Sequence, residues 1–264
     1  MTTTTITLYN SSCFDLLNDR EKLPDKSVRL FLLDLPYGIT DAEWDVLIDL
    51  EEMWRGIKRT MTDDGTIVFF CTTKFGVSII NSNPKWFKYD LVWKKSMKQG
   101  FLNVKKKPLV EHEMVYVFNK AKPVYNSQKF LKPDFDGNVK EIIKKKTRTT
   151  LYKCKQQEWV HVDDGTRHPG SILDFKSILN TTKDKKRVRW HPTQKPIELL
   201  EFLIKSYTNE GDLVCDFCAG SSSAAIAAHN TGRSFIGSEL TEEFFDVSIQ
   251  RFKEEIGVDV EVSE

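Results

Sequence analysis

Two short hydrophobic runs in the first third of the chain predict buried strands. Residues 28–34 read VRLFLLD and residues 65–72 read GTIVFFCT, almost without polar positions. Such continuous runs are typical of parallel strands that are covered on both faces. Between them, residues 45–61 place apolar side chains at helical spacing, namely at Val46, Leu47, Leu50, Met53, Trp54 and Ile57. The pattern predicts a strand–helix–strand unit.

The middle of the chain changes character. Residues 89–95 and 112–118 alternate and are rich in β-branched and aromatic residues, which predicts two more strands. From about residue 119 to residue 190 the periodicity fades while lysines accumulate. We interpret this stretch as an irregular insertion or a small subdomain.

Regular periodicity returns after the HPTQKP segment at 191–196. A helix is expected to begin at Ile197 and to stop by Gly211. A strand that ends at Asp216 follows, then a turn of small residues, a helix, the strand SFIGSEL at 234–240 and a helix over 242–255. The second half therefore predicts another βαβ unit.

Together these elements predict an α/β fold with a doubly wound, mostly parallel, Rossmann-like sheet. We divide the chain into a catalytic half of the core at 1–118, a basic insertion at 119–190 and a ligand-binding half of the core at 191–264.

The net charge of +1 conceals a strong segregation of charge. Residues 85–190 contain 26 Lys and Arg but 11 Asp and Glu, whereas the rest of the chain is acidic by a similar excess. A basic segment on an acidic core indicates contact with a polyanion such as nucleic acid. Solvated lysine-rich loops without a partner are the alternative interpretation.

The composition bears on the cellular location of the protein and on its content of disulfides and metals. The N-terminus MTTTTITLYN lacks the features of a secretory signal, and no apolar run approaches the roughly 20 residues of a membrane span. The five cysteines are scattered, and the Cys215–Cys218 pair lacks a second pair to complete a zinc site. We expect a soluble intracellular protein with no membrane and no metal.

The segment VCDFCAGSSS marks a candidate ligand site. A strand that ends at Asp216 turns through small residues into a helix, so a ligand can approach the backbone. Glu239 ends the next strand, where a carboxylate is placed to bind ribose hydroxyls. The G-x-G-x-x-G pattern is absent, which favours a nucleoside-bearing ligand without a pyrophosphate. A plain strand–turn–helix is the alternative.

Four motifs occur in the order DLPY, HPTQKP, DFCAGSSS and GSEL. In this order the chain resembles the β-class of S-adenosylmethionine-dependent DNA amino-methyltransferases, with an Asp-Leu-Pro-Tyr variant of the catalytic motif. The resemblance covers nearly the whole chain. It implies a circularly permuted sheet, in which the catalytic motif precedes the cofactor motif, and a target-recognition role for the basic insertion.

The resemblance assigns catalytic roles to Asp34, Leu35, Pro36 and Tyr37. The carboxylate of Asp34 and the carbonyl of Leu35 would accept the two amine protons of a flipped base. Pro36 would stiffen the backbone, and Tyr37 would stack on the base. The transfer would be direct and in-line. Leu35 stands where the family usually has Pro, and only its carbonyl is required.

Asp34, where cytosine-amino enzymes usually carry Ser, favours adenine as the substrate. A cytosine amino-methyltransferase of the same family and a catalytically silent nucleic-acid-binding subunit are the alternatives. The combined presence of Asp34, Pro36, Tyr37, Asp216 and Glu239 argues against a silent subunit.

The same resemblance implies S-adenosylmethionine as the cofactor. Its expected contacts are Thr193, Lys195, Asp216, Phe217, Gly220, Ser221, Ser222 and Glu239. Ser222 replaces a glycine common in the family, which narrows the turn. The expected partner is double-stranded DNA, with phosphate contacts from Lys105, Lys106, Lys107, Lys144, Lys145 and Lys146. A homodimer and a prokaryotic cytoplasm (or a host cytoplasm, for a viral protein), with a restriction-modification or orphan role, fit the resemblance.

Overall fold

The computed structural model describes residues 4–38, 45–146, 157–178, 190–191, 193–257 and 261–262. The chain divides into two compact units. The larger unit contains Met1–Asn126 and Ser171–Glu264, and the smaller unit contains Ser127–Gly170. Among the helices of the described ranges, none combines the length and the apolar character that a membrane span requires.

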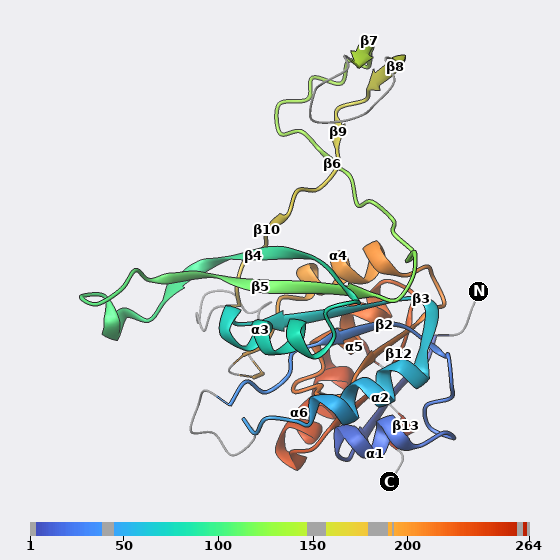
Figure 1. Ribbon diagram of the computed structural model, residues 1–264, viewed down its shortest axis with the longest axis vertical. Helices are drawn as coiled ribbons and strands as arrows, with labels where there is room; N and C mark the ends of the chain where they lie inside the picture. Colours follow the sequence, from blue (N-terminus) through green and yellow to red (C-terminus); the bar gives the residue numbers. More distant parts are fainter. Residues whose placement is uncertain are drawn as a thin grey trace. The chain divides into compact units, whose positions relative to one another are not determined.

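A mixed sheet forms the centre of the larger unit (Figure 1). Within the described residues it has nine strands: β1 (Ile6–Asn10), β2 (Val28–Leu33), β3 (Met61–Cys71), β4 (Phe87–Gln99), β5 (Val110–Asn119), β10 (Ile172–Asp174), β11 (Leu213–Asp216), β12 (Ser234–Glu239) and β13 (Glu261–Val262). Their order is β10-β4-β5-β3-β2-β11-β12-β1-β13. Neighbouring strands run parallel, except that β5 is antiparallel to β3 and β4. The α/β fold with a mostly parallel sheet is thus confirmed.

Helices cover both faces of the sheet, because successive residues of the central strands point to opposite sides. In β2, Leu30 and Leu32 enter one core cluster, whereas Phe31 and Leu33 enter the other. The first cluster packs against α4 (Ile197–Tyr207), α5 (Ser223–Asn230) and α6 (Glu242–Glu255). The second packs against α1 (Cys13–Asn18), α2 (Leu50–Thr60) and α3 (Thr73–Ser82). The continuous hydrophobic run of β2 is explained by this double burial.

The direction of winding reverses between β2 and β11. These strands are adjacent and parallel, and Leu30 pairs with Val214. From β2 the chain passes through α2 to β3 on one side, and from β11 it passes through α5 to β12 on the other. In open α/β sheets the ligand crevice lies at such a reversal, outside the carboxyl ends of the strands.

The helix predicted over 45–61 begins later than expected. Asp49 caps α2 by accepting hydrogen bonds from the backbone N–H groups of Glu51 at 2.8 Å and Glu52 at 3.1 Å. Val46 and Leu47 therefore precede the helix and are 66% and 59% exposed. The prediction was wrong there, because a local cap overrode the apolar spacing. Helices α1 and α3 were not predicted.

The smaller unit lies within the predicted insertion at 119–190 and has strands of its own. β6 (Phe130–Leu131) pairs with β9 (Thr166–Arg167), and β7 (Lys140–Lys146) pairs with β8 (Gln157–Asp163), both antiparallel. Residues 119–126 and 171–178 belong to the larger unit. The part of the insertion that packs as a separate unit, Ser127–Gly170, is therefore shorter than the predicted insertion at 119–190.

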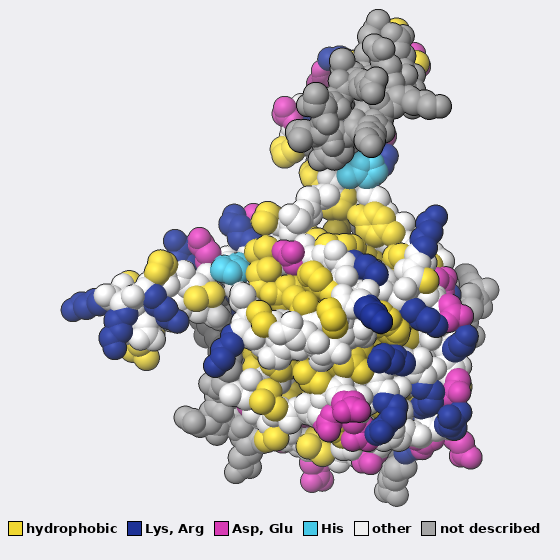
Figure 2. Space-filling model, viewed as in Figure 1, with side chains coloured by type: hydrophobic (Ala, Val, Ile, Leu, Met, Phe, Trp, Pro, Cys, Tyr) yellow, Lys and Arg dark blue, Asp and Glu magenta, His cyan; other side chains and the backbone are white. Residues whose placement is uncertain are grey.

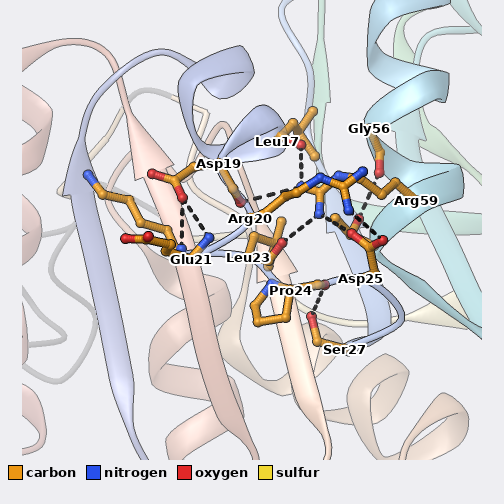
Figure 3. A network of polar contacts seen from close by, with 12 residues as sticks. Leu17, Asp19, Arg20, Glu21, Leu23, Pro24, Asp25, Ser27, Gly56 and Arg59 are labelled. Atoms are coloured by element: carbon orange, nitrogen blue, oxygen red, sulfur yellow. Dashed lines mark hydrogen bonds and ion pairs between the residues drawn. The ribbon is translucent and has the colours of Figure 1, made fainter.

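Arg59, near the end of α2, forms hydrogen bonds that stabilise the segment between α1 and β2 (Figure 3). Its guanidinium donates to the carbonyl oxygens of Leu17 at 2.7 Å and Leu23 at 2.9 Å. It also donates to the carboxylate of Asp25 at 2.6 Å. The Arg59 side chain is only 16% exposed, so these carbonyls depend on the arginine.

Arg59→Met is expected to lower the free energy of unfolding by about 1–3 kcal/mol, because it leaves buried carbonyl oxygens without a donor. Urea denaturation measures the change. Arg55→Met is the matched control, since Arg55 lies on the same helix but is 70% exposed and pairs with Glu52 one turn earlier. An equal loss in both variants would show that Arg59 has no special role.

Candidate active site

The carboxyl ends of three neighbouring parallel strands, β2, β11 and β12, each place a carboxylate beside one cavity of about 990 Å³. Asp34 follows β2, Asp216 ends β11 and Glu239 ends β12. Each of the three lines the cavity, although Asp216 and Glu239 are only 6% and 8% exposed. A cavity of this size at a topological reversal is a typical small-molecule site.

Hydrogen bonds hold the described start of the loop after β2 at this edge. The Asp45 carboxylate accepts hydrogen bonds from the backbone N–H groups of Tyr37 at 2.7 Å and Gly38 at 2.8 Å. The hydroxyl of Tyr37 donates to Asp34 Oδ1 at 2.7 Å. The Tyr37 ring packs against Phe75 with 5.3 Å between the ring centroids. The loop thus presents the Asp34 carboxylate in one orientation.

A buried lysine lies against that carboxylate. Lys195, from the segment before α4, forms an ion pair with Asp34 through Oδ2 and with Glu113 Oε1 at 3.3 Å. Glu113, on β5, pairs through its other oxygen with Lys95 at 2.6 Å. All four side chains are less than a quarter exposed. Two carboxylates and two ammonium groups therefore form a buried, charge-balanced cluster.

Burial and neighbouring charge act in opposite directions on this cluster. Burial raises the pKa of Asp34, and Lys195 opposes the rise. Burial would also raise the pKa of Glu113, but the two lysines more than offset it, so that pKa is lowered. Burial lowers the pKa of Lys195, yet Asp34 and Glu113 raise it overall, so the lysine stays protonated. Burial, followed by the charge of Asp34, raises the pKa of Tyr37 and keeps its hydroxyl a donor.

The turn between β11 and α5 builds the other side of the cavity. Glu239 accepts hydrogen bonds from the backbone N–H groups of Gly220 at 2.8 Å and Thr241 at 2.9 Å. Gly220 has φ +54°, and a side chain there would point toward His191 at 3.9 Å. Ser222 has the same left-handed φ, which is rare for residues other than glycine. A ligand can therefore approach the backbone closely at Gly220.

Arg251 of α6 secures this turn from behind. It is 1% exposed and donates to the carbonyl of Ser221 at 2.8 Å and to the hydroxyl of Ser223 at 2.8 Å. Glu255 balances its charge at 2.8 Å. Because these hydrogen bonds and this ion pair involve a buried charged group, they stabilise the conformation of the turn.

Asp216 is the most strongly perturbed carboxyl group of this turn. Burial raises its pKa to about 8, although the backbone N–H of Cys218, at 3.1 Å, favours the ionised form. Asp34 and Glu239 raise the pKa further. A cationic ligand in the cavity would favour the ionised form of Asp216 and lower this pKa.

The structure brings most of the sequence-predicted residues to this single cavity. Its lining includes Asp34, Leu35, Pro36, Tyr37, Thr193, Lys195, Asp216, Phe217, Gly220, Ser221 and Glu239. Ser222 is fully buried beneath the turn. Lys195, assigned above to the cofactor, has its ammonium on Asp34 and Glu113. The hydroxyl of Thr193 lies 3.0 Å from His191 Nδ1, and Pro192 lies outside the described residues.

The predicted DNA-binding lysines lie elsewhere. Lys105, Lys106 and Lys107 are exposed in the turn of the β4–β5 hairpin. Figure 2 shows Lys and Arg side chains beside hydrophobic ones at the end of this hairpin, where Phe101 is 74% exposed. At the other end of the hairpin turn, where β4 ends and β5 begins, Gln99 and Val110 line the cavity. The backbone of Lys144, Lys145 and Lys146 lies in β7, and their side chains are outside the described part of the chain.

Sequence reasoning missed Glu113, Lys95, Asp45 and Arg251. No motif contains Glu113 or Lys95, and each looks like an ordinary polar position of an alternating strand. The available signal for Glu113 and Lys95 was only that each is a charged residue within a predicted strand. Their importance comes from contacts distant in sequence.

The family model described as DNA methylase, of the N6/N4 type, matches residues 28–250. The type II methyltransferase M1.MboII of Moraxella bovis is 27% identical over 249 residues, which cover 90% of this chain and 92% of that protein. The DNA adenine methyltransferase YhdJ of Escherichia coli strain K12 is 28% identical over 251 residues, which cover 90% and 80%.

Solved structures share the fold. The PvuII DNA methyltransferase (cytosine-N4-specific) aligns with a TM-score of 0.67 and 18% identity over 97% of this chain and 89% of that chain. The crystal structure of an M1.HpyAVI–SAM complex aligns with a TM-score of 0.60 and 24% identity, over 94% of this chain and all of that chain.

The perturbed pKa of Asp216 predicts a pH-dependent stability. The folded value of about 8 exceeds the ordinary 3.8, so the folded state binds the proton more tightly. Stability is therefore greatest below pH 4 for this group and is lost as the pH rises toward 8, by at most about 1.4 kcal/mol per pH unit. Asp216→Asn should remove this loss. Urea denaturation at pH 6 and pH 9 measures it, and an unchanged pH dependence in the variant would contradict the assignment.

Proposed function

Because this chain belongs to the N6/N4 DNA methylase family, we propose that it transfers a methyl group from S-adenosylmethionine to the exocyclic amine of adenine in DNA. The observation that carries the proposal is that one cavity contains both Asp34 and the Asp216–Glu239 pair. Its volume of about 990 Å³ suits a nucleoside cofactor together with a flipped base.

The residues of the Asp216 side fit this cofactor. The carboxylate of Glu239, at the end of β12, is placed to accept hydrogen bonds from ribose hydroxyls. Asp216, with its raised pKa, favours a ligand that brings positive charge. Gly220 leaves the backbone open to close approach. When bound, S-adenosylmethionine supplies a methyl group that is electrophilic because it is carried by a sulfonium.

The residues of the Asp34 side orient the amine. The Asp34 carboxylate and the Leu35 carbonyl accept hydrogen bonds from the two N–H groups of the amine. These bonds turn the nitrogen lone pair toward the methyl group. Pro36 limits the motion of the loop, and Asp45 holds it through the N–H groups of Tyr37 and Gly38. Positioning of this kind contributes several kcal/mol without a covalent enzyme intermediate. The methylated nitrogen releases its extra proton along the hydrogen bond to Asp34.

Adenine is favoured over cytosine by the carboxylate of Asp34, which stands where cytosine-amino enzymes of the resembling class usually carry Ser. The name of the relative YhdJ supports adenine, whereas the PvuII structure is cytosine-specific. Cytosine is therefore the second candidate. We also assign the chain to the β-class, with its permuted motif order, because Asp34 precedes Asp216 along the chain. The homodimer stays a prediction.

The basic residues supply the DNA contacts of the proposal. Extracting a base costs a few kcal/mol, which phosphate contacts can offset. The hairpin lysines Lys105, Lys106 and Lys107 are exposed, and the strands of the same hairpin line the cavity through Gln99 and Val110, so we expect these lysines to contact the phosphates next to an extracted base. Lys144, Lys145 and Lys146 of the smaller unit form the second predicted contact.

Asp34→Ala is expected to abolish methyl transfer while cofactor affinity stays within about tenfold, because Asp34 orients the amine and not the cofactor. Transfer of radioactive methyl groups to duplex DNA and calorimetry of S-adenosylmethionine binding measure the two quantities. Full activity of this variant would refute the mechanism.

Glu239→Ala is the reciprocal control. It should weaken S-adenosylmethionine binding by about 1.5–3 kcal/mol, the range for losing hydrogen bonds to a charged group. Glu239→Gln, which keeps the shape that Gly220 and Thr241 contact, separates loss of the cofactor contact from collapse of the turn. Unchanged affinity in both variants would remove Glu239 from the site.

Replacing Lys105, Lys106 and Lys107 together by Ala should reduce the salt dependence of duplex binding. The logarithm of affinity falls by about 0.9 per neutralised phosphate for each unit of log salt, so the slope should flatten by up to about three. The loss should be alike for all sequences, because phosphate contacts position the protein without specifying bases. A second variant replaces Lys144, Lys145 and Lys146 together by Ala. Salt titrations of both variants test the two lysine clusters separately, and an unchanged slope in both variants would exclude phosphate contacts by either cluster.

A further inference from the structure

The ammonium of Lys195 occupies the place that the proposed reaction needs. Tyr37 donates to Asp34 Oδ1 at 2.7 Å, and Lys195 donates to Oδ2. Each oxygen of the Asp34 carboxylate thus already accepts one hydrogen bond. A target amine that binds Asp34 must therefore either share an oxygen with one of these donors or displace it.

A buried ammonium group cannot simply leave its carboxylate. The Lys195 side chain is 9% exposed, and a buried charge without a partner costs several kcal/mol. Glu113 offers the alternative, because its Oε1 lies 3.3 Å from Lys195 Nζ and its own side chain is 11% exposed. Lys95 binds the other oxygen of Glu113 at 2.6 Å and so leaves Oε1 facing Lys195. Moving between the two carboxylates therefore never leaves the lysine unpaired.

We propose that Lys195 is a movable cation that covers Asp34 until a target base enters, and that Glu113 is the positioning residue that then receives it. This inference rests on the proposed methyl transfer. The lysine neutralises a buried carboxylate while the cavity holds no base. Once the amine binds Asp34, the ammonium shifts onto Glu113, and the total charge of the cluster stays the same.

The pH dependence of the reaction gives this exchange a signature that a purely structural role lacks. The groups that face Asp34 are Lys195, Glu113, Tyr37, Cys71 and Asp216. In Glu113→Gln the negative charge of Glu113, which raises the pKa of Asp34, is removed, and of the two carboxylates that pair with Lys195 in the described residues only Asp34 remains. The acid limb of the rate profile should then move to lower pH, while the plateau rate falls because the amine no longer displaces the lysine.

The experiment compares wild type, Glu113→Gln and Glu111→Gln. Glu111 is the matched control, since it lies on the same strand and pairs with a lysine of β4 at 3.5 Å, but is half exposed. Single-turnover methyl transfer to duplex DNA is measured across pH, and calorimetry reports S-adenosylmethionine affinity. We expect Glu113→Gln to lose about tenfold or more of the plateau rate, as for removal of one partner of a buried pair, with cofactor affinity within about twofold. Glu111→Gln should match wild type.

A double-variant cycle then tests whether Glu113 acts through the lysine. In a Lys195→Met background, Glu113→Gln should change the plateau rate by less than about twofold, because no cation remains to be received. An equal loss in both backgrounds overturns the proposal, as does a wild-type profile of Glu113→Gln or a plateau loss with an unmoved acid limb. A cofactor affinity lowered more than about tenfold by Lys195→Met would assign the lysine to the cofactor instead.

The outcomes also separate this inference from the proposed function. If wild type transfers no methyl group to DNA, the proposed function fails and the exchange fails with it. If wild type is active and the Glu113→Gln profile is unchanged, only the exchange fails. If Lys195→Met is inactive at every pH, the plateau rate and the acid limb of Glu113→Gln decide together, and an unchanged plateau rate overturns the exchange.

Discussion

The parallel pairing of β2 with β11 is the constraint on which the site depends. It joins two halves of the sheet that wind in opposite directions, and it aligns Leu30 with Val214. Asp34 and Asp216, 182 positions apart in the chain, consequently meet at one edge. A shift of this register by one residue would turn every side chain of β2 to the other face, so that Leu30 and Leu32 would exchange core clusters with Phe31 and Leu33.

Burial at that edge determines the electrostatics. Strands covered on both faces exclude water, so burial raises the pKa values of the carboxyl groups that follow them. Lys195 opposes the rise at Asp34 without cancelling it, and Glu113 with Lys95 completes the charge balance of the cluster. Asp216 has no such lysine contact within hydrogen-bonding distance among the described residues, and its pKa remains about 8. This asymmetry is consistent with the proposed function, in which the amine of a target base binds beside Asp34 and a cationic cofactor binds beside Asp216.

The basic stretch of the sequence is divided between two structural settings. Lys105, Lys106 and Lys107 belong to a hairpin of the large sheet, whose lower part borders the cavity. Lys144, Lys145 and Lys146 belong to β7 of the smaller unit. Charge segregation in the sequence thus indicated a polyanion, but it did not show that two separate elements carry the charge.

Local signals determined a large part of this protein. The hydrophobic runs of β2 and β3, the helix α6 over residues 242–255 and the carboxylates at strand ends were readable, because each depends on neighbours in sequence. The start of α2 at Leu50 was not, since the side chain of Asp49 outweighed apolar spacing. Only the tertiary structure placed Lys195 between Asp34 and Glu113, because that contact joins residues 161 positions apart. The energy of such an ion pair arises from a shared low-dielectric environment, which no single segment of the chain creates by itself.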